Sequence, residues 1–556
     1  MLAGLIIKIV GTLMDLLIPY ILEYIIDVVV PSGNARHIVF WGTIMILCSI
    51  GGISGNIIAN RMASAVARDT TKEIRHDLFY RISYLSARQI DEITVPTLET
   101  RLTSDTYNIH QMTGMMQRLG VRAPILLIGG VAVTFSMEPV LALVLISVLP
   151  FMTAAVWLIS KKGIPLFKKL QQKTDDMVRI VRENAQGIRV IKALSKTEYE
   201  AEKFDRQNRE VAAAELSSGK TMAITNPLMS AFLNIGMAAV ILVGAFRVNG
   251  GKAEAGMIIA FMSYFTIILN AMLSITRLFT LYSKGAASAA RISEIIEIPD
   301  DFEICGDKTT EDTDSIIEFR DVCFAYPGKK STLEHISFSI KKGQTLGIIG
   351  ATGSGKSTVI QLLLRFYDAS SGKILINGRD IKSYTAAELR SRFGTVLQND
   401  FIYADTVLEN IDFGRGIDFE SIKSASAYAQ ADFISELEDT FSYHLNTKGT
   451  NLSGGQKQRI LISRALASNP EILVLDDSSS ALDYKTDSRL RASLRKQYSE
   501  TTKIIVAQRV SSISHADLIL VLNGGKIVGS GKHEELIENC PIYKEISRSQ
   551  IGGTIE

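Results

Sequence analysis

The chain has 556 residues, of which 47% are apolar, and its formal net charge is +2. This length leaves room for two or more domains, and a charge so close to balance argues against a nucleic-acid partner. The apolar excess lies almost wholly before about residue 285. The cysteines have neither disulfide-framework nor metal-ligand spacing and indicate ordinary thiols in a reducing compartment: Cys48, Cys305, Cys323 and Cys540.

Six apolar stretches are long enough to cross a lipid bilayer as helices. The first follows Met1 without a basic leading segment or a small-residue cleavage site, so we expect a membrane span and not a removable signal peptide. The stretches are residues 2–30, 39–60, 119–136, 140–160, 227–246 and 255–281.

The connections between these stretches alternate in length and charge. Residues 31–37, 136–139 and 247–254 form short turns, whereas 61–118 and 161–220 are long, helix-like and rich in Lys and Arg. By the positive-inside rule, the long connections and everything after the sixth stretch are cytoplasmic. The sequence therefore predicts a multi-pass protein of the cytoplasmic membrane.

The helical patterns of the long connections continue the spans into the cytosol. They break near residues 86–97 and 183–192, and each break has room for a short transverse helix. The alternative is a solvated helical hairpin that makes no contacts.

Four charged residues interrupt the first span: Lys8, Asp15, Glu23 and Asp27. At about 100° per residue they fall within one stripe roughly 120° wide. Because intramembrane charges are costly, this stripe is a candidate lining of a pathway in the bundle interior. In the alternative interpretation, Lys8 and Asp27 reach the two membrane interfaces and only Asp15 and Glu23 are internal.

The composition changes after the sixth span. We assign residues 1–284 to a six-helix all-α transmembrane domain and residues 285–315, which become small and then acidic, to a linker. Residues 316–556 begin with the strand-like segment 316–320 and mix β-branched strands with helical segments. This pattern predicts an α/β P-loop nucleotide-binding domain.

The first functional motif of this domain is a phosphate-binding loop of the form G-x-x-x-x-G-K-[ST]. An apolar strand, 345–349, enters the loop and a helix, 359–365, leaves it, so the helix N-terminus points at the anion. In such loops the backbone N–H groups hold nucleotide phosphates, the Lys reaches the β- and γ-phosphates, and the hydroxyl holds Mg²⁺. The candidate ATP-binding residues are Gly350, Thr352, Gly353, Ser354, Gly355, Lys356, Ser357 and Thr358.

Two further motifs follow. Residues 472–476 form a buried strand that ends in Asp476, a carboxylate placed to hold Mg²⁺ or its water. Between this strand and the loop, Leu452 precedes a second phosphate-binding element that opens a helix: Ser453, Gly454, Gly455 and Gln456. One ATP does not need two such elements on one chain.

With these motifs the chain resembles the ATP-binding cassette (ABC) family, specifically half-transporters of the multidrug-exporter type. The resemblance implies that Tyr326 stacks on adenine, that Gln398 senses the γ-phosphate and Mg²⁺, and that residues 480–483 lie at a dimer contact. It also implies that two cassettes bind head to tail, so that each ATP lies between one chain's phosphate loop and the other's signature. The breaks in the long connections resemble coupling helices that rest on the cassettes.

The chain departs from the family pattern at the catalytic positions. It has Asp477 where an active site has Glu, Gln508 where a His is expected, and residues 447–449 read Thr-Lys-Gly in place of Glu-Arg-Gly. Asp is one methylene shorter than Glu, and a misplacement of about 1 Å can cost on the order of 10²-fold in rate. We therefore expect Asp477, Gln508 and Gln398 to form a slow, degenerate ATP site.

The leading hypothesis is one subunit of a heterodimeric ABC exporter, whose partner is a different half-transporter with a catalytic Glu and His. A homodimeric exporter with two weak sites is the alternative, as is an ATP-gated channel or regulatory membrane ATPase. The expected cofactors are ATP and Mg²⁺, and the expected partners are the second half-transporter, the lipid bilayer and a transported substrate. Drugs, lipids and peptides all fit this architecture.

Overall fold

The computed structural model describes residues 2–302, 304, 310–328, 331–478 and 480–551. Cys305 and Glu303, an acid of the predicted linker, lie outside the described residues. The chain divides into two compact units. The first comprises Met1–Ser83 and Pro96–Ile298, and the second comprises Tyr84–Val95 and Pro299–Glu556.

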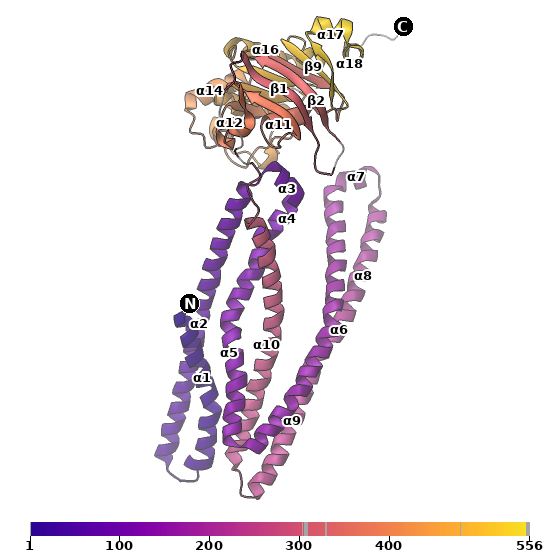
Figure 1. Ribbon diagram of the computed structural model, residues 1–556. Helices are drawn as coiled ribbons and strands as arrows, with labels where there is room; N and C mark the ends of the chain where they lie inside the picture. Colours follow the sequence, from indigo (N-terminus) through magenta and orange to yellow (C-terminus); the bar gives the residue numbers. More distant parts are fainter. Residues whose placement is uncertain (1, 303, 305–309, 329–330, 479, 552–556) are drawn as a thin grey trace. The chain divides into compact units, whose positions relative to one another are not determined.

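The first unit is helical (Figure 1). Its described part holds six helices, counting continuous runs as one, that are long and apolar enough to cross a membrane, as predicted. The elements are α1 (Leu2–Tyr24) with the π-helical turn η1 (Ile25–Val29), α2 (Ala35–Ser83), α4 (Val95–Thr100) with η2 (Arg101–Asp105), α5 (Thr106–Met137), α6 (Pro139–Gln186), α7 (Ile188–Ala193), α8 (Thr197–Ala223), α9 (Thr225–Asn249) and α10 (Ala255–Ile296).

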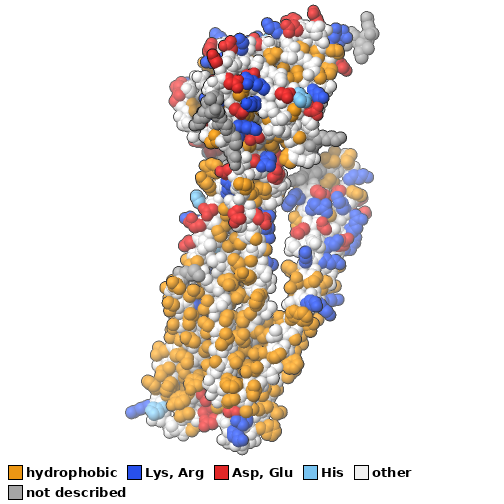
Figure 2. All heavy atoms as spheres, in the orientation of Figure 1, with side chains coloured by type: hydrophobic (Ala, Val, Ile, Leu, Met, Phe, Trp, Pro, Cys, Tyr) orange, Lys and Arg blue, Asp and Glu red, His pale blue; other side chains and the backbone are white. Residues whose placement is uncertain are grey.

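Several of these helices are much longer than a bilayer is thick. Helix α2 has 49 residues, or about 74 Å at ~1.5 Å per residue, against a hydrocarbon core of about 30 Å. The spans thus continue as helices beyond the membrane, as their sequence pattern predicts. On the face in Figure 2, apolar side chains cover the part of this unit that holds the predicted spans, and Lys and Arg gather around α7 and the adjoining ends of α6 and α8.

Three of the four charged residues of the first span bind groups on other helices. Lys8 is 3% exposed and its Nζ donates to Asn60 Oδ1 at 3.0 Å, at the end of the second predicted span. The Asp15 carboxylate accepts from Arg122 at 3.0 Å. Asp27 accepts from the backbone N–H groups of Gly256 and Met257, at 2.6 and 2.9 Å, and so caps the N-terminus of α10.

The predicted linker is partly helical. Helix α10 continues to Ile296 through its first twelve positions, where alanines at 286, 287, 289 and 290 favour a helix.

The second unit is an α/β domain with two sheets. One is antiparallel, in the order β2-β1-β4-β5, and the other follows the order β10-β9-β3-β8-β7-β6, parallel except for β10. The strands are β1 (Ser315–Phe324), β2 (Leu333–Lys341), β3 (Thr345–Gly350), β4 (Ser371–Ile376), β5 (Arg379–Asp380), β6 (Phe393–Val396), β7 (Ile472–Asp476), β8 (Thr502–Val506), β9 (Leu518–Asn523) and β10 (Lys526–Gly531).

Helices flank these sheets (Figure 1). One buried core joins both sheets to the helix after the phosphate loop, through Phe319, Ile348 and Ile360 among others, and a second surrounds Ile460 and Leu466 of α15. The helices are α11 (Lys356–Leu363), α12 (Ala386–Arg390), α13 (Val407–Asp412), α14 (Phe419–Tyr428), α15 (Gly454–Ala467), α16 (Tyr484–Gln497), α17 (His533–Asn539) and α18 (Pro541–Ile551).

A short helix from the first long connection, α3 (Ala87–Ile93), packs within the second unit. Ser86 and Gln89 form a capping box at its start. Gln89 Nε2 donates to Pro299 O at 2.9 Å, and the Tyr367 hydroxyl donates to the Asp91 carboxylate. The first predicted transverse helix is therefore present and makes contacts, which excludes a contact-free hairpin there. Helix α7 occupies the second break, and none of its side chains is buried.

Candidate functional site

The carboxyl ends of four neighbouring parallel strands bring the predicted catalytic residues together. The phosphate loop follows β3, Asp476 ends β7, and Asp477 comes directly after it. Gln508 lies two residues beyond β8 and Gln398 two residues beyond β6. Ligands bind at this edge of open α/β sheets because the loops after the strands meet there.

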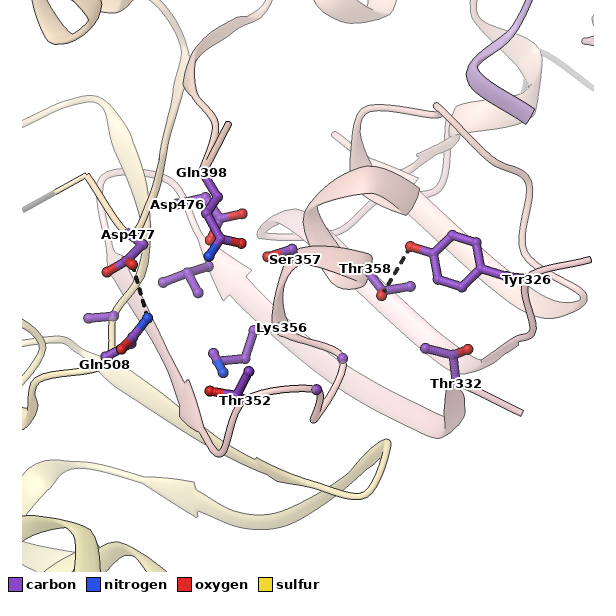
Figure 3. Close-up of a pocket in the computed structure, with 14 residues that line it drawn as sticks. Tyr326, Thr332, Thr352, Lys356, Ser357, Thr358, Gln398, Asp476, Asp477 and Gln508 are labelled. Carbon is purple, nitrogen blue, oxygen red and sulfur yellow. Dashed lines mark hydrogen bonds between the residues drawn. The ribbon is translucent and has the colours of Figure 1, made fainter. Parts of the chain in front are cut away.

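These residues line one cavity of about 310 Å³ (Figure 3). The predicted residues that line it are Tyr326, Thr352, Gly353, Gly355, Lys356, Ser357, Thr358, Gln398, Asp476, Asp477 and Gln508. Gly350 and Ser354 are not among its lining residues. Three lining residues were not predicted: Thr332, Val506 and Ala507. No motif marks Thr332, and the other two only precede Gln508 in the chain.

The phosphate loop has the backbone that its glycines allow. Gly355 has φ = +99° at the N-cap of α11, and a Cβ there would lie 2.5 Å from Leu333 Cδ2, so both the backbone conformation and the space disfavour a side chain. The Lys356 ammonium donates to the carbonyls of Gly350 and Ala351 at 2.9 and 2.8 Å. Burial lowers its pKa, an effect that Asp476 and Asp477 oppose.

Two consecutive carboxylates face the loop. Asp476 is 4% exposed, and burial raises its pKa. Burial also raises the pKa of Asp477, whose Oδ2 accepts from Gln508 Nε2 at 3.0 Å (Figure 3). Asp477 has φ = +52°, an uncommon conformation for a non-glycine residue. The Asp477–Gln508 bond joins the ends of two adjacent strands, since Asp476 pairs with Val506 in the sheet.

Tyr326 forms the opposite wall of the cavity. Its hydroxyl lies 3.3 Å from Thr358 Oγ1 (Figure 3). The same hydroxyl donates to Gln361 Oε1. Its ring packs edge-on against Tyr367, with centroids 5.2 Å apart and planes at 84°. These contacts fix an aromatic ring near the start of α11, where a flat apolar base could stack on it.

The signature residues lie elsewhere in the domain, at the start of α15. Ser453 and Gln456 form a capping box: Ser453 N donates to Gln456 Oε1 at 2.8 Å and Gln456 N donates to Ser453 Oγ at 3.3 Å. Gly454 is exposed. None of these residues lines the cavity of its own chain.

Comparison with known proteins places the chain in a family. Residues 1–272 match the family described as ABC transporter transmembrane region, and residues 333–480 match the family described as ABC transporter. An uncharacterized ABC transporter ATP-binding protein of Mycobacterium tuberculosis is 33% identical over 98% of this chain and 94% of that protein. YfiB of Bacillus subtilis, described in the same words, is 32% identical over 97% of this chain and 94% of its own length.

A solved structure has the same fold. The structure of a bacterial Atm1-family ABC exporter with ATP bound matches with a TM-score of 0.85 at 24% identity, covering 100% of this chain and 98% of that one. The chain therefore belongs to the ABC transporter family. It is a half-transporter with one transmembrane domain and one ATP-binding domain, and its fold is that of an ABC exporter.

Its general activity follows from this membership. The chain is a multi-pass membrane protein with a cytoplasmic ATP-binding domain, and it is an ATPase coupled to transport. ABC exporters, whose fold this chain has, act as dimers in a membrane.

Proposed function

We propose that this chain is the degenerate-site subunit of a heterodimeric exporter of the multidrug type. Its own phosphate loop forms the slow ATP site, and its signature completes the hydrolytic site of a different half-transporter. That partner supplies the Glu and the His that this chain lacks.

The bond between Asp477 and Gln508 carries this proposal. A hydrolytic site needs a carboxylate that reaches the attacking water and a group that orients the γ-phosphate. Here the carboxylate is shortened by one methylene, and its Oδ2 accepts the amide of Gln508 at 3.0 Å. The Gln508 amide does not take up a proton as an imidazole would. The pair supports slow hydrolysis because both orienting groups are altered and bonded to each other.

ATP binding does not depend on that pair. We assign the phosphates to the N–H groups of the loop and to Lys356, and the adenine to the ring of Tyr326. The oxygen donors of Ser357, Gln398 and Asp476 fit Mg²⁺, a hard cation that keeps few protein ligands beside nucleotide oxygens. When bound, Mg²⁺ neutralises charge that develops on the phosphates. Ser354 Oγ is buried and unpaired within the described residues, which also fits a loop built to close around phosphate.

The position of the signature supports a partner site. Ser453 and Gly454 are exposed at a helix N-terminus, and neither lines the chain's own cavity. A helix N-terminus offers free N–H groups to an anion. The second nucleotide of a head-to-tail dimer is the ligand that this element would bind.

The test compares one substitution at each end of the chain, in the complex purified with the polypeptide that co-purifies with this one. Asp477→Asn should lower phosphate release by less than half. Gly454→Leu should lower it more than tenfold, because the side chain blocks the approach of the backbone to the γ-phosphate of the productive ATP. Gly416→Leu is a control for a bulky residue at an exposed glycine whose ideal Cβ meets no atom within 4 Å, although its φ of +69° adds some strain.

The reverse ranking would show that this chain hydrolyses its own ATP, and the degenerate-site proposal would be dropped. Two alternatives remain distinguishable. Activity of this chain purified alone as a dimer would favour a homodimeric exporter. Substrate flux only down a gradient would favour an ATP-gated channel.

A further inference from the structure

A second cavity of about 310 Å³ lies in the helical unit, where α5 and α10 pack against each other. It falls within the third and sixth predicted spans. Its lining combines apolar and polar side chains: Leu119, Ala123, Leu126, Ile267 and Ala271, with Arg122, Asn270 and Ser274. A lining of this kind suits a molecule with an apolar body and a polar head.

Only one nitrogen of the Arg122 guanidinium is bonded to Asp15. Its Nη2 donates to Asp15 Oδ2 at 3.0 Å, and Asn56 Nδ2 donates to the same oxygen at 3.3 Å. Arg122 Nε is buried and has no partner within the described residues. The guanidinium normally binds a carboxylate or phosphate through two parallel bonds. The single bond to Asp15 therefore leaves donors of Arg122 available, and its side chain is 40% exposed.

Cations outnumber carboxylates among the charged groups that act on Lys8. Lys8 lies within electrostatic range of Arg118, Arg122 and Asp15. Lys8 is bonded to the neutral side chain of Asn60, and Arg118 to the hydroxyl of Ser64. Lys8 and two arginines, of which Arg118 lies just before the third predicted span, are thus near one carboxylate, and an uncompensated charge is expensive within a membrane. An anion entering this region would be attracted and a cation repelled.

Asn270 supplies a further donor. Ser274 Oγ donates to the Asn270 carbonyl at 2.8 Å, so the hydroxyl proton of Ser274 is already used. The side-chain amide of Asn270 is exposed, and the described residues give it no hydrogen-bond partner. An anionic head group on Arg122 would accept from this amide as well.

We infer that the α5–α10 cavity binds the anionic head group of an amphipathic molecule, a carboxylate or a phosphate, on Arg122. The apolar lining residues hold its hydrocarbon part, and Asp15 competes with the head group for the guanidinium. That such a molecule is also the transported substrate rests on the proposed exporter function. Binding itself needs neither hydrolysis nor the degenerate site.

The experiment measures binding to the full-length chain, with its co-purifying partner, in nanodiscs of phosphatidylcholine. Four probes share one chain and differ in the head: dodecanoate, dodecyl phosphate, dodecanol and dodecylamine. We expect one or both anions to bind at least tenfold more tightly than the alcohol and the amine. The two anionic probes tell a carboxylate ligand from a phosphate ligand.

Two substitutions should change the affinity for the preferred anion in opposite directions. Arg122→Gln should weaken binding of the preferred anion about tenfold or more, the range for loss of a charged hydrogen-bonded pair. Asp15→Asn should strengthen it severalfold, because the competing carboxylate is gone. Dodecanol binding should change less than twofold in both variants. Arg179→Gln, a control on an exposed arginine paired with Asp176 at 3.1 Å, should change none of these values.

Weaker anion binding in both variants would mean that the Arg122–Asp15 pair only holds the helices together, and the inference would be overturned. Equal binding of all four probes, or of none, would also overturn it. Arg122→Lys keeps the charge but loses the paired N–H donors of the guanidinium, so its anion affinity should lie between those of the wild-type chain and Arg122→Gln. This variant also controls for a folding defect in Arg122→Gln. Phosphate release by the same preparations reports separately on the proposed function.

Discussion

Tyr367 connects the wall of the nucleotide cavity to helix α3. Its ring packs against Tyr326 at a centroid distance of 5.2 Å, and its hydroxyl donates to the Asp91 carboxylate. Asp91 belongs to the connection between two membrane-spanning helices. The ring of Tyr367 therefore lies between that connection and Tyr326, the predicted adenine contact. We predict that this bond holds α3 on the domain.

The size of the effect follows from the burial of the two groups. A hydrogen bond to a charged group contributes about 1.5–3 kcal/mol, but Asp91 is exposed, and solvent screening reduces the value to about 1 kcal/mol. Tyr367→Phe keeps the ring, which is 6% exposed, and removes only the hydroxyl. A loss of about 1 kcal/mol corresponds to about fivefold more frequent opening of α3.

Hydrogen exchange of the amides of residues 87–93, measured on the full-length protein in nanodiscs, tests this value. Tyr367→Phe and Asp91→Ala should each raise the exchange rate about fivefold, and the double variant should add nothing further, since each removes the same hydrogen bond. ATP should protect these amides in the wild-type chain and less in Tyr367→Phe. Tyr498→Phe, at a buried tyrosine whose hydroxyl donates to Leu466 O at 3.3 Å, is the control. Additive effects of the two substitutions would refute the reasoning.

Three further predictions concern other parts of the chain. Lys356→Ala should weaken binding of a fluorescent ATP analogue at least tenfold, whereas Lys342→Ala, on an exposed turn, should not. A cysteine in the 247–254 turn should react with an impermeant reagent from outside and one at Lys169 should not; labelling of both from one side would contradict the six-span topology. Because the bond to Arg88 holds the pKa of Asp301 below its usual range, α3 should stay protected from exchange at neutral pH, and protection should fall only when the pH drops below the usual carboxyl range and Asp301 is protonated.

The features that the sequence predicts well are encoded by neighbouring residues. The phosphate loop needs glycines, Lys356 and Ser357 at fixed spacing, and its strand and helix adjoin it in the chain. The six spans are continuous apolar runs, and the breaks that hold α3 and α7 interrupt a helical pattern locally. The fold class, the ATP-binding domain and the orientation in the membrane therefore followed from residues that are close together in sequence.

The linker shows where this local reasoning fails. Residues 285–296 look like a break because they are small, yet they extend α10. Small residues favour a helix as readily as a linker, and packing decides between them. Gly285 and Ser288, for example, are buried, and Ser288 Oγ donates to Asp105 Oδ1 at 2.8 Å.

Only the tertiary structure brought together residues that are far apart in the chain. The sequence named Asp477 and Gln508 separately, but their bond depends on the pairing of β7 with β8. It marked Lys8 and Asp15 as costly charges, but the partners Asn60 and Arg122 come from other helices. Nothing local marked Thr332 as a cavity residue or joined Asp91 to Tyr367. Side-chain chemistry is set by the sequence, whereas distances between segments are set by how strands pair and helices pack.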